Sequence, residues 1–176
     1  AIAGLSWSDS FQSNVSEGKG DAGNLDDLPF PARHLINLSN YNNLIGTNDV
    51  TATIQSSRGC PFACTFCDIR RTQFRWRDPQ NVVDEVEALA EQGIKDFFFV
   101  DDTITIRKKR VHEICEEISR RGIKIQFKIS SRVDCITEDL LGALKKAGCY
   151  RIHYGVESAV QRSLDYLEKG INLDLV

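Results

Sequence analysis

Residues 93–102 read GIKDFFFVDD, and residues 122–134 read GIKIQFKISSRVD. Each stretch starts with a glycine, continues into mainly apolar residues and ends in charged or hydroxyl side chains. Apolar runs of this length, bounded by turn residues, are typical of strands buried in a parallel sheet. The two stretches therefore predict buried strands over 94–100 and 123–129, with polar groups at their carboxyl ends.

Helices are predicted before, between and after these strands. Asp78 and Pro79 form a strong helix start, with Asp as the N-cap and Pro at the first helical position. A later helix begins at Thr137, and a last helix, capped by Ser158, follows a strand over 149–156. The apolar face of the first helix consists of Val82, Val83, Val86, Leu89 and Ala90, and that of the second of Val111, Ile114, Cys115 and Ile118. The four helices are expected to end at glycines, namely Gly93, Gly122, Gly148 and Gly170.

This alternation of helix, glycine and strand extends over residues 51–176. It is typical of βα units with right-handed crossovers and a parallel sheet. With a first strand at 51–55, the chain holds four such units and stops where a fifth strand would begin. A complete eight-stranded barrel needs about 250 residues, and the chain has 176. The expected fold is therefore α/β, a partial (β/α) barrel, and we expect the chain to be a piece of a larger protein.

Residues 1–50 differ in composition from the rest of the chain. They are rich in Ser, Asn, Gly and Asp, so we expect an irregular linker with one short hairpin, in which 2–7 pairs with 11–15. The Leu-Pro-Phe-Pro segment at 28–31 is expected to be extended and to clamp the linker onto the domain at 51–176.

Composition and charge exclude several classes of protein. The side chains are 41% hydrophobic and 27% charged, and the formal net charge is −3. Since there is no basic excess, we do not expect nucleic-acid binding. No apolar run approaches the ~20 residues that a membrane span requires, and the first residues do not resemble a signal peptide. We therefore expect a cytoplasmic protein with no membrane span.

Six cysteines are present, and three of them, Cys60, Cys64 and Cys67, are crowded into one short stretch. Crowded cysteines in a chain without secretory signals point to metal binding in a reducing compartment. Three ligands on a four-iron cluster would leave one iron open for another ligand. A structural zinc ion is the alternative, but it prefers four ligands. The fourth would have to come from outside this stretch: Cys115, Cys135, Cys149, His34, His112 or His153.

The chemistry is expected at the carboxyl ends of the strands, where ligands bind in sheets of this kind. Asp101 and Asp102 follow the second strand, Arg132 the third and Glu157 the fourth. The turns at the opposite end offer mainly Gly and Lys. The alternative roles are structural: the aspartates could cap the next segment, and Arg132 could pair with Asp134.

The pattern CxxxCxFC after a first strand resembles the radical S-adenosylmethionine (radical SAM) family, over roughly residues 51–176. Further motifs resemble its cobalamin-dependent branch: DDLPFPAR at 26–33, VDDTIT at 100–105, SRVD at 131–134 and YGVES at 154–158. In that branch a separate cobalamin-binding domain precedes this stretch, and residues 1–25 resemble the segment that leaves it. The DxHxxG motif of such a domain is absent here, so this segment is not expected to bind cobalamin by itself.

The resemblance implies the roles of the site residues. The three crowded cysteines would hold a 4Fe-4S cluster whose open iron binds SAM, and Phe66 would lie beside the adenine. Asp101 or Asp102 occupies the place where the family presents a group to the SAM amino nitrogen. Glu157 resembles the acid that binds the ribose hydroxyls, and Arg132 could pair with the SAM carboxylate. The family often has glycine where this chain has Ala159, a mild departure that leaves Glu157 credible.

The resemblance also implies the reaction, which is reductive cleavage of SAM to a 5′-deoxyadenosyl radical. A small-molecule or cofactor-like substrate and an electron donor such as flavodoxin or ferredoxin would be the partners. In the full protein, methyl transfer or cyclisation could follow, with cobalamin as a cofactor there. The sequence identifies neither the substrate nor a catalytic side chain. Two alternatives remain, an electron-transfer iron–sulfur module and a zinc-stabilised binding domain.

The remaining cysteines and histidines have structural explanations. Cys115 lies on the apolar stripe of its helix, and Cys135 and Cys149 are also expected to be structural. The three histidines are isolated in the sequence, and of these His153 could face the barrel interior and contact a ligand. A basic run after the cysteines, formed by Arg70, Arg71, Arg75 and Arg77 with Trp76 among them, is expected to be a solvated loop over the cluster. The alternative is a contact with a substrate carboxylate, a cofactor phosphate or tRNA.

Overall fold

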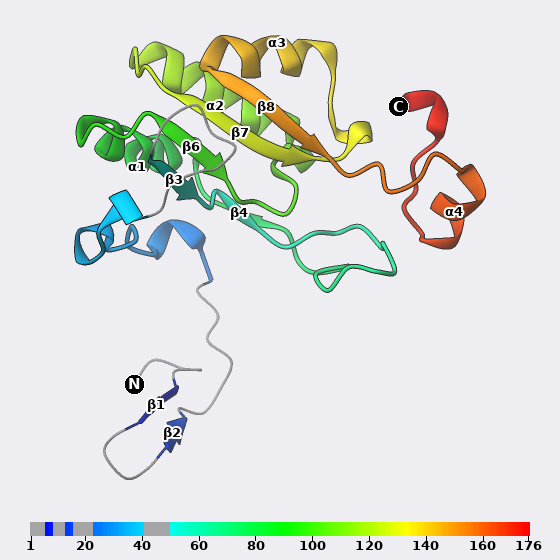
Figure 1. Cartoon of the computed structure of the whole chain (residues 1–176), viewed down its shortest axis with the longest axis horizontal. Helices are drawn as coiled ribbons and strands as arrows, with labels where there is room; N and C mark the ends of the chain where they lie inside the picture. The colour runs from blue at the N-terminus through cyan, green and yellow to red at the C-terminus, as the bar shows by residue number, and fades with distance from the viewer. Residues whose placement is uncertain (1–5, 9–12, 16–22, 41–49) are drawn as a thin grey trace.

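The computed structural model describes residues 6–8, 13–15, 23–40 and 50–176, which form an α/β fold (Figure 1). Its main sheet has four parallel strands in the order β3-β6-β7-β8. Their bounds are β3 Thr51–Ile54, β6 Asp96–Phe99, β7 Gln126–Ser131 and β8 Cys149–Tyr154. The sheet does not close, so the predicted partial barrel with four strands is confirmed. None of the helices in these ranges has the length and apolar character that a membrane span requires.

Three helices cover one face of this sheet (Figure 1). They are α1 Pro79–Glu91, α2 Lys108–Arg120 and α3 Glu138–Ala147, and a short α4 Gln161–Tyr166 follows β8. The apolar faces predicted for the first two helices are all buried against the strands. This layer leaves the other face of the sheet for the interior of the partial barrel.

The predicted helix boundaries have local physical causes. The side chain of Asp78 accepts a hydrogen bond from Gln80 N and caps α1, and Thr137 caps α3 in the same way. Gly148 ends α3 with a φ of 106°, a conformation that side chains disfavour. A Cβ at this position would also lie 2.2 Å from the Ile125 carbonyl oxygen. Glycine is therefore required where α3 turns into β8.

The predicted strands differ in detail from the observed ones. The strand expected over 94–100 is shorter, and Val100 is exposed rather than buried. The strand expected over 123–129 begins three residues later, at Gln126, and extends to Ser131. Phe98 lies on the inner face and is only half-buried, near the His153 ring.

The bounds predicted for the last helix were wrong. Instead of running from Ser158 to residue 170, it is limited to α4. The Ser158 hydroxyl accepts a hydrogen bond from Val160 N outside the helix, so it does not cap it. The backbone reverses at Glu168, which has a φ of 50°, and a short 3-10 helix at 173–175 ends the chain.

The linker has a short hairpin and a docked part. Strand β1 Ser6–Ser8 pairs antiparallel with β2 Ser13–Val15, within the segment where a hairpin is expected. The remainder of that hairpin lies outside the described residues. Further along, the Arg33 guanidinium donates to the Thr53 carbonyl oxygen and pairs with Glu85 of α1. Both Asp26 carboxylate oxygens accept from Asp78 N, and the linker is thereby fixed to the domain.

Candidate functional site

A cavity of about 380 Å³ lies at the carboxyl ends of the parallel strands. It is lined by the loop that holds the crowded cysteines and by the segments that follow β6, β7 and β8. Of the site residues predicted from sequence, it brings together Cys60, Cys64, Cys67, Phe66, Asp102, Arg132 and Glu157. Residues up to 97 positions apart in the chain therefore meet where the strand order predicts.

The cysteine loop is closed at its base by a short antiparallel pair, β4 Ser57–Arg58 with β5 Arg75–Trp76. Immediately after β4, Gly59 has a φ of 86°, and a Cβ there would lie 2.2 Å from the Gln73 carbonyl oxygen. The Thr72 hydroxyl accepts from Cys60 N, and Thr72 N donates to the Cys60 carbonyl. These contacts fix the first cysteine at the cavity wall.

The three thiols are partly withdrawn from water. Cys60 and Cys64 are buried and Cys67 is half-buried, and all three are free. Burial, with the neighbouring thiols Cys67 and Cys64, raises the pKa of Cys60. Within the part of the chain that is described, no three His, Cys, Asp or Glu side chains converge enough to hold a single metal ion. A four-iron cluster makes no such demand, because each cysteine binds a different iron.

The two aspartates after β6 have different environments. Asp101 is buried and accepts from Ser56 N and from the Ser56 and Ser57 hydroxyls. Burial raises its pKa, against the lowering effect of these hydrogen bonds. Asp102 lines the cavity, and its carboxylate accepts from Gly59 N at 3.0 Å. Asp101 thus orders the start of the cysteine loop, whereas Asp102 faces the cavity.

Arg132 is held in one orientation. Its Nε and Nη2 donate to the two Asp134 carboxylate oxygens, at 3.0 and 2.7 Å, and Nη2 also donates to the Lys169 carbonyl. The guanidinium lies over the Phe62 ring, and its Nη1 is 3.5 Å from Cys64 Sγ. Although burial opposes the charge, these bonds to Asp134 raise the pKa of Arg132. The pairing with Asp134, an alternative in the sequence, is thus present.

Glu157 occupies a strained position at the cavity. Its φ is 73°, which a residue with a side chain rarely adopts and which is often found at functional sites. Lys169 Nζ donates to Glu157 Oε1 at 3.1 Å and lies over the Phe66 ring. Lys169 also lines the cavity, and sequence reasoning missed it. A lysine before a glycine is typical of a helix end, so the sequence did not indicate that Lys169 lines the cavity.

The cysteine loop is also held from the C-terminal side. Thr65 N donates to the Leu167 carbonyl at 3.0 Å, and the exposed Arg71 pairs with Glu168. The segment 167–169, which we call the C-terminal strap, therefore contacts both the cysteine loop and the cavity side chains.

Cys115 and Cys149 lie away from the cavity, whereas Cys135 lies beside the Arg132 side chain. Cys115 and Cys135 are buried, and Cys149 is partly buried against the core. Burial raises the pKa of Cys115 to about 12 and that of Cys149 to about 11. These values are typical of inert structural thiols.

Among the histidines, only His153 lines the cysteine cavity. His112 lies 3.0 Å from an Asp139 carboxylate oxygen on the helical side, and His34 is exposed. The arginines of the basic run differ in burial. Arg77 is buried against Glu85 and does not belong to a solvated loop, whereas Arg70 and Arg71 are exposed.

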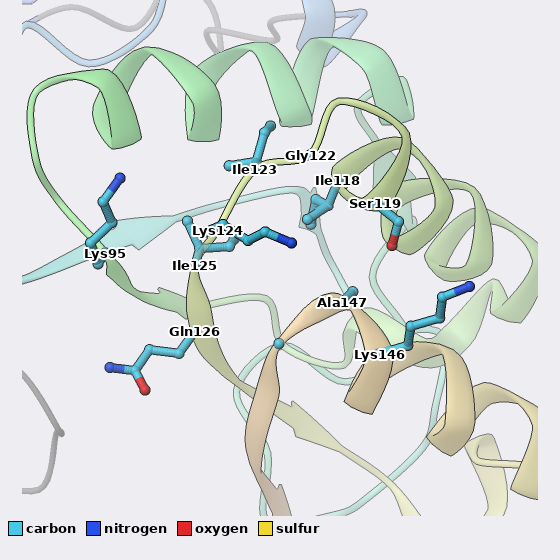
Figure 2. A pocket seen from close by; sticks show the side chains of 11 residues that line it. Lys95, Ile118, Ser119, Gly122, Ile123, Lys124, Ile125, Gln126, Lys146 and Ala147 are labelled. Atoms are coloured by element: carbon cyan, nitrogen blue, oxygen red, sulfur yellow. The ribbon is translucent and has the colours of Figure 1, made fainter.

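A second cavity, of about 580 Å³, lies at the opposite end of the sheet (Figure 2). It is formed by the turns between helices and strands, with Lys95, Lys124 and Lys146 around Ile123 and Ile125. Lys95 Nζ donates to the Ala90 carbonyl, so this amine already caps α1. The glycine and lysine composition predicted for this end is confirmed, and the sulfur and carboxylate groups lie at the other end.

Comparisons with known proteins agree with this geometry. The sequence model of a protein family, the radical SAM superfamily, matches residues 54–176. An uncharacterized methyltransferase of Pyrococcus horikoshii is 35% identical over 175 residues, which is 97% of this chain and 37% of that protein. The anaerobic magnesium-protoporphyrin IX monomethyl ester cyclase of Rubrivivax gelatinosus is 37% identical over 135 residues, 74% of this chain and 24% of the cyclase. The chain therefore spans well under half of each relative.

Solved structures have the same fold. The radical SAM methyltransferase TsrM of Kitasatospora setae, with cobalamin and a 4Fe-4S cluster bound, superposes with a TM-score of 0.62 at 25% identity, over 65% of this chain and 24% of that one. The cobalamin-dependent SAM radical enzyme OxsB, with aqua-cobalamin and SAM bound, gives a TM-score of 0.64 over 99% of this chain and 27% of that one. Its identity is 21%, so this second likeness concerns the fold alone.

Proposed function

The chain belongs to the radical SAM superfamily, and we propose that its cavity at the strand ends holds a 4Fe-4S cluster and SAM. Cys60, Cys64 and Cys67 would ligate three irons and leave the fourth for SAM. When bound, the cluster would supply the electron for reductive cleavage of SAM to methionine and a 5′-deoxyadenosyl radical, and hydrogen abstraction from the substrate would follow. The residues around the cavity would bind and orient SAM and would exclude water from it.

The observation that carries this proposal is the convergence of the three thiols with acidic, basic and aromatic side chains on one cavity. SAM brings an amino group, a carboxylate, ribose hydroxyls and an adenine ring. In this assignment Asp102 receives the amino group, Glu157 the ribose hydroxyls, and Phe66 stacks beside the adenine. Asp101 has a supporting role, because its carboxylate is buried on Ser56 and Ser57. The strap residue Lys169 places a further cation beside Glu157.

For the whole protein we propose a radical SAM enzyme that methylates or cyclises a small-molecule or cofactor-like substrate, with cobalamin bound by another part of the protein. Relatives named as methyltransferases and as a cyclase support both outcomes. An external flavodoxin or ferredoxin would supply the electron. Six free thiols suit a reducing compartment such as the cytoplasm.

Anaerobic reconstitution with iron and sulfide tests the proposal. We expect close to four irons per chain, a spectrum that changes when SAM is added, and dithionite-dependent 5′-deoxyadenosine. Cys64→Ala should lose these properties, and the matched variant Cys149→Ala should retain them because Cys149 lies in the core. A cluster that does not respond to SAM would indicate an electron-transfer module. A colourless protein that binds zinc would indicate a structural domain.

A further inference from the structure

The contact between Arg132 and Cys64 is not explained by SAM binding. Arg132 is 5% exposed, and its Nη1 lies 3.5 Å from Cys64 Sγ, within the distance of a hydrogen bond to sulfur. A guanidinium remains protonated under all ordinary conditions. A permanent positive charge with an N–H group therefore touches one of the three proposed cluster ligands.

Three of the four remaining N–H groups of Arg132 are already in use. Asp134 accepts from Nε and Nη2 in a two-pronged arrangement, and the Lys169 carbonyl accepts a second bond from Nη2. The Phe62 ring covers one face of the guanidinium, with 3.8 Å between Cζ and the ring centroid. No pair of parallel N–H groups is left to bind a carboxylate in the manner typical of arginine. The SAM carboxylate role inferred from the sequence thus has little geometric support.

We propose that Arg132 is a positioning residue that donates to the Cys64 sulfur and raises the reduction potential of the cluster. The inference rests on the proposed function, since it assumes that Cys64 ligates the cluster. Reduction adds a negative charge, and a nearby cation with an N–H···S bond stabilises that charge. The effect is strong where water is excluded, because screening there is weak. Asp134 and Lys169 hold the guanidinium in place before the electron arrives.

The test measures the reduction potential of the reconstituted cluster in the absence of SAM. Parent chain, Arg132→Gln, Arg132→Lys and Arg162→Gln are titrated with dithionite and followed by EPR. Arg162 is a matched control, because it is an exposed arginine on α4. In Arg132→Gln we expect the equilibrium constant for reduction to fall about tenfold, which is about 59 mV for one electron. Arg132→Lys keeps the positive charge but loses the two-pronged contact with Asp134, so its reduction potential should lie between those of Arg132→Gln and the parent.

Iron content and circular dichroism are measured on every variant. If Arg132→Gln cannot retain the cluster, the shift in Arg132→Lys decides the question. Equal potentials in the parent and in every Arg132 variant that holds a cluster would overturn the inference, and a loss of SAM affinity alone would assign Arg132 to SAM instead. A parent chain that assembles no cluster would overturn the proposed function itself, and the two failures are therefore distinguishable.

Discussion

Lys169 donates from its ammonium group to Glu157, with 3.1 Å between Nζ and Oε1. The same residue accepts from Arg132 through its carbonyl oxygen. One position in the C-terminal strap therefore orients two side chains of the cavity, one by its side chain and one by its backbone. Because the strap also binds Thr65 in the cysteine loop, the end of the chain and the proposed cluster loop form one structural unit.

The Glu157 carboxylate is expected to contribute directly to SAM affinity. Glu157→Gln retains the shape but loses the charge, and a hydrogen bond to a charged group is worth roughly 1.5–3 kcal/mol. We therefore expect SAM affinity of the cluster-loaded chain to fall about tenfold or more, measured by anaerobic equilibrium dialysis. Glu91→Gln is the control, since Glu91 is an exposed carboxylate at the end of α1 and does not line the cavity. Equal affinities in both variants would contradict the ribose assignment.

The first turn of the cysteine loop requires glycine. In Gly59→Ala, the new methyl group would meet the Gln73 carbonyl, and the positive φ adds strain of roughly 1–2 kcal/mol. We expect the loop to shift and the iron content after reconstitution to fall to less than half. Gly122→Ala separates the two effects, because Gly122 has a φ of +67° but open space around it. That variant should lose only stability and should bind iron normally.

Much of the fold was predictable because helix caps, glycine stops and apolar runs are local signals. The apolar stripes of α1 and α2 follow directly from their spacing, and the strand order placed the acidic, basic and sulfur groups at one end. The exact strand starts were not predictable, since they depend on the path of the turn after Gly122. The extent of α4 was missed for a similar reason, because the left-handed backbone at Glu168 depends on tertiary contacts of the strap.

The sequence predicted most of the residues that line the site, but it did not predict the contacts that those residues make. Spacing identified the three cysteines, but no local pattern distinguishes Asp101, buried on two serines, from Asp102, which faces the cavity. Nor could the sequence decide whether Arg132 binds Asp134 or a ligand, since that depends on packing against Phe62 and Cys64. Lys169 was missed because its importance arises from contacts with residues far away in the chain.

The six thiols should separate into two classes by reactivity. In the cluster-free chain, alkylation by iodoacetamide at pH 8 should modify Cys67 first, because it is the more exposed of the loop cysteines. Cys115 and Cys149 should remain unmodified, since burial raises the pKa of these thiols to about 12 and about 11 and only a thiolate reacts. Peptide mass spectrometry identifies the sites. Rapid labelling of Cys115 without denaturant would show that its helix is not packed as described.

An acidic residue on α2 makes stability depend on pH. Hydrogen bonds from Arg120 and Arg121 lower the pKa of Glu117 to about 2, below its usual value of 4.5. Since the folded value is depressed, its stabilising contribution is fully present above pH 4.5 and is lost as the pH falls toward 2. Glu117→Gln should therefore lower the melting temperature at pH 7 and have little effect near pH 2. An equal difference at both pH values would contradict the ion-pair explanation.

The linker is fixed to the domain by a buried charge on α1. Glu85 is 2% exposed and pairs with Arg33 of the linker through one oxygen and with Arg77 through the other. Removing one member of a buried ion pair typically costs 3–5 kcal/mol, because the remaining charges stay buried without a partner. Glu85→Gln should therefore lower the free energy of unfolding in urea by about 3 kcal/mol.

The loss of this carboxylate should also weaken the linker contact more than the rest of the fold. Arg33 retains its bond to the Thr53 carbonyl oxygen, at 2.6 Å, but its positive charge is no longer paired with the carboxylate of Glu85. We expect limited proteolysis to cleave Glu85→Gln within residues 23–40 at low protease concentrations that leave the parent intact. Glu91→Gln, at an exposed position at the end of the same helix, controls for the loss of a carboxylate from α1. If Glu85→Gln and Glu91→Gln unfold and are cleaved alike, the paired arginines do not hold the linker, and the buried Leu25 and the Asp26 bonds to Asp78 N must anchor it.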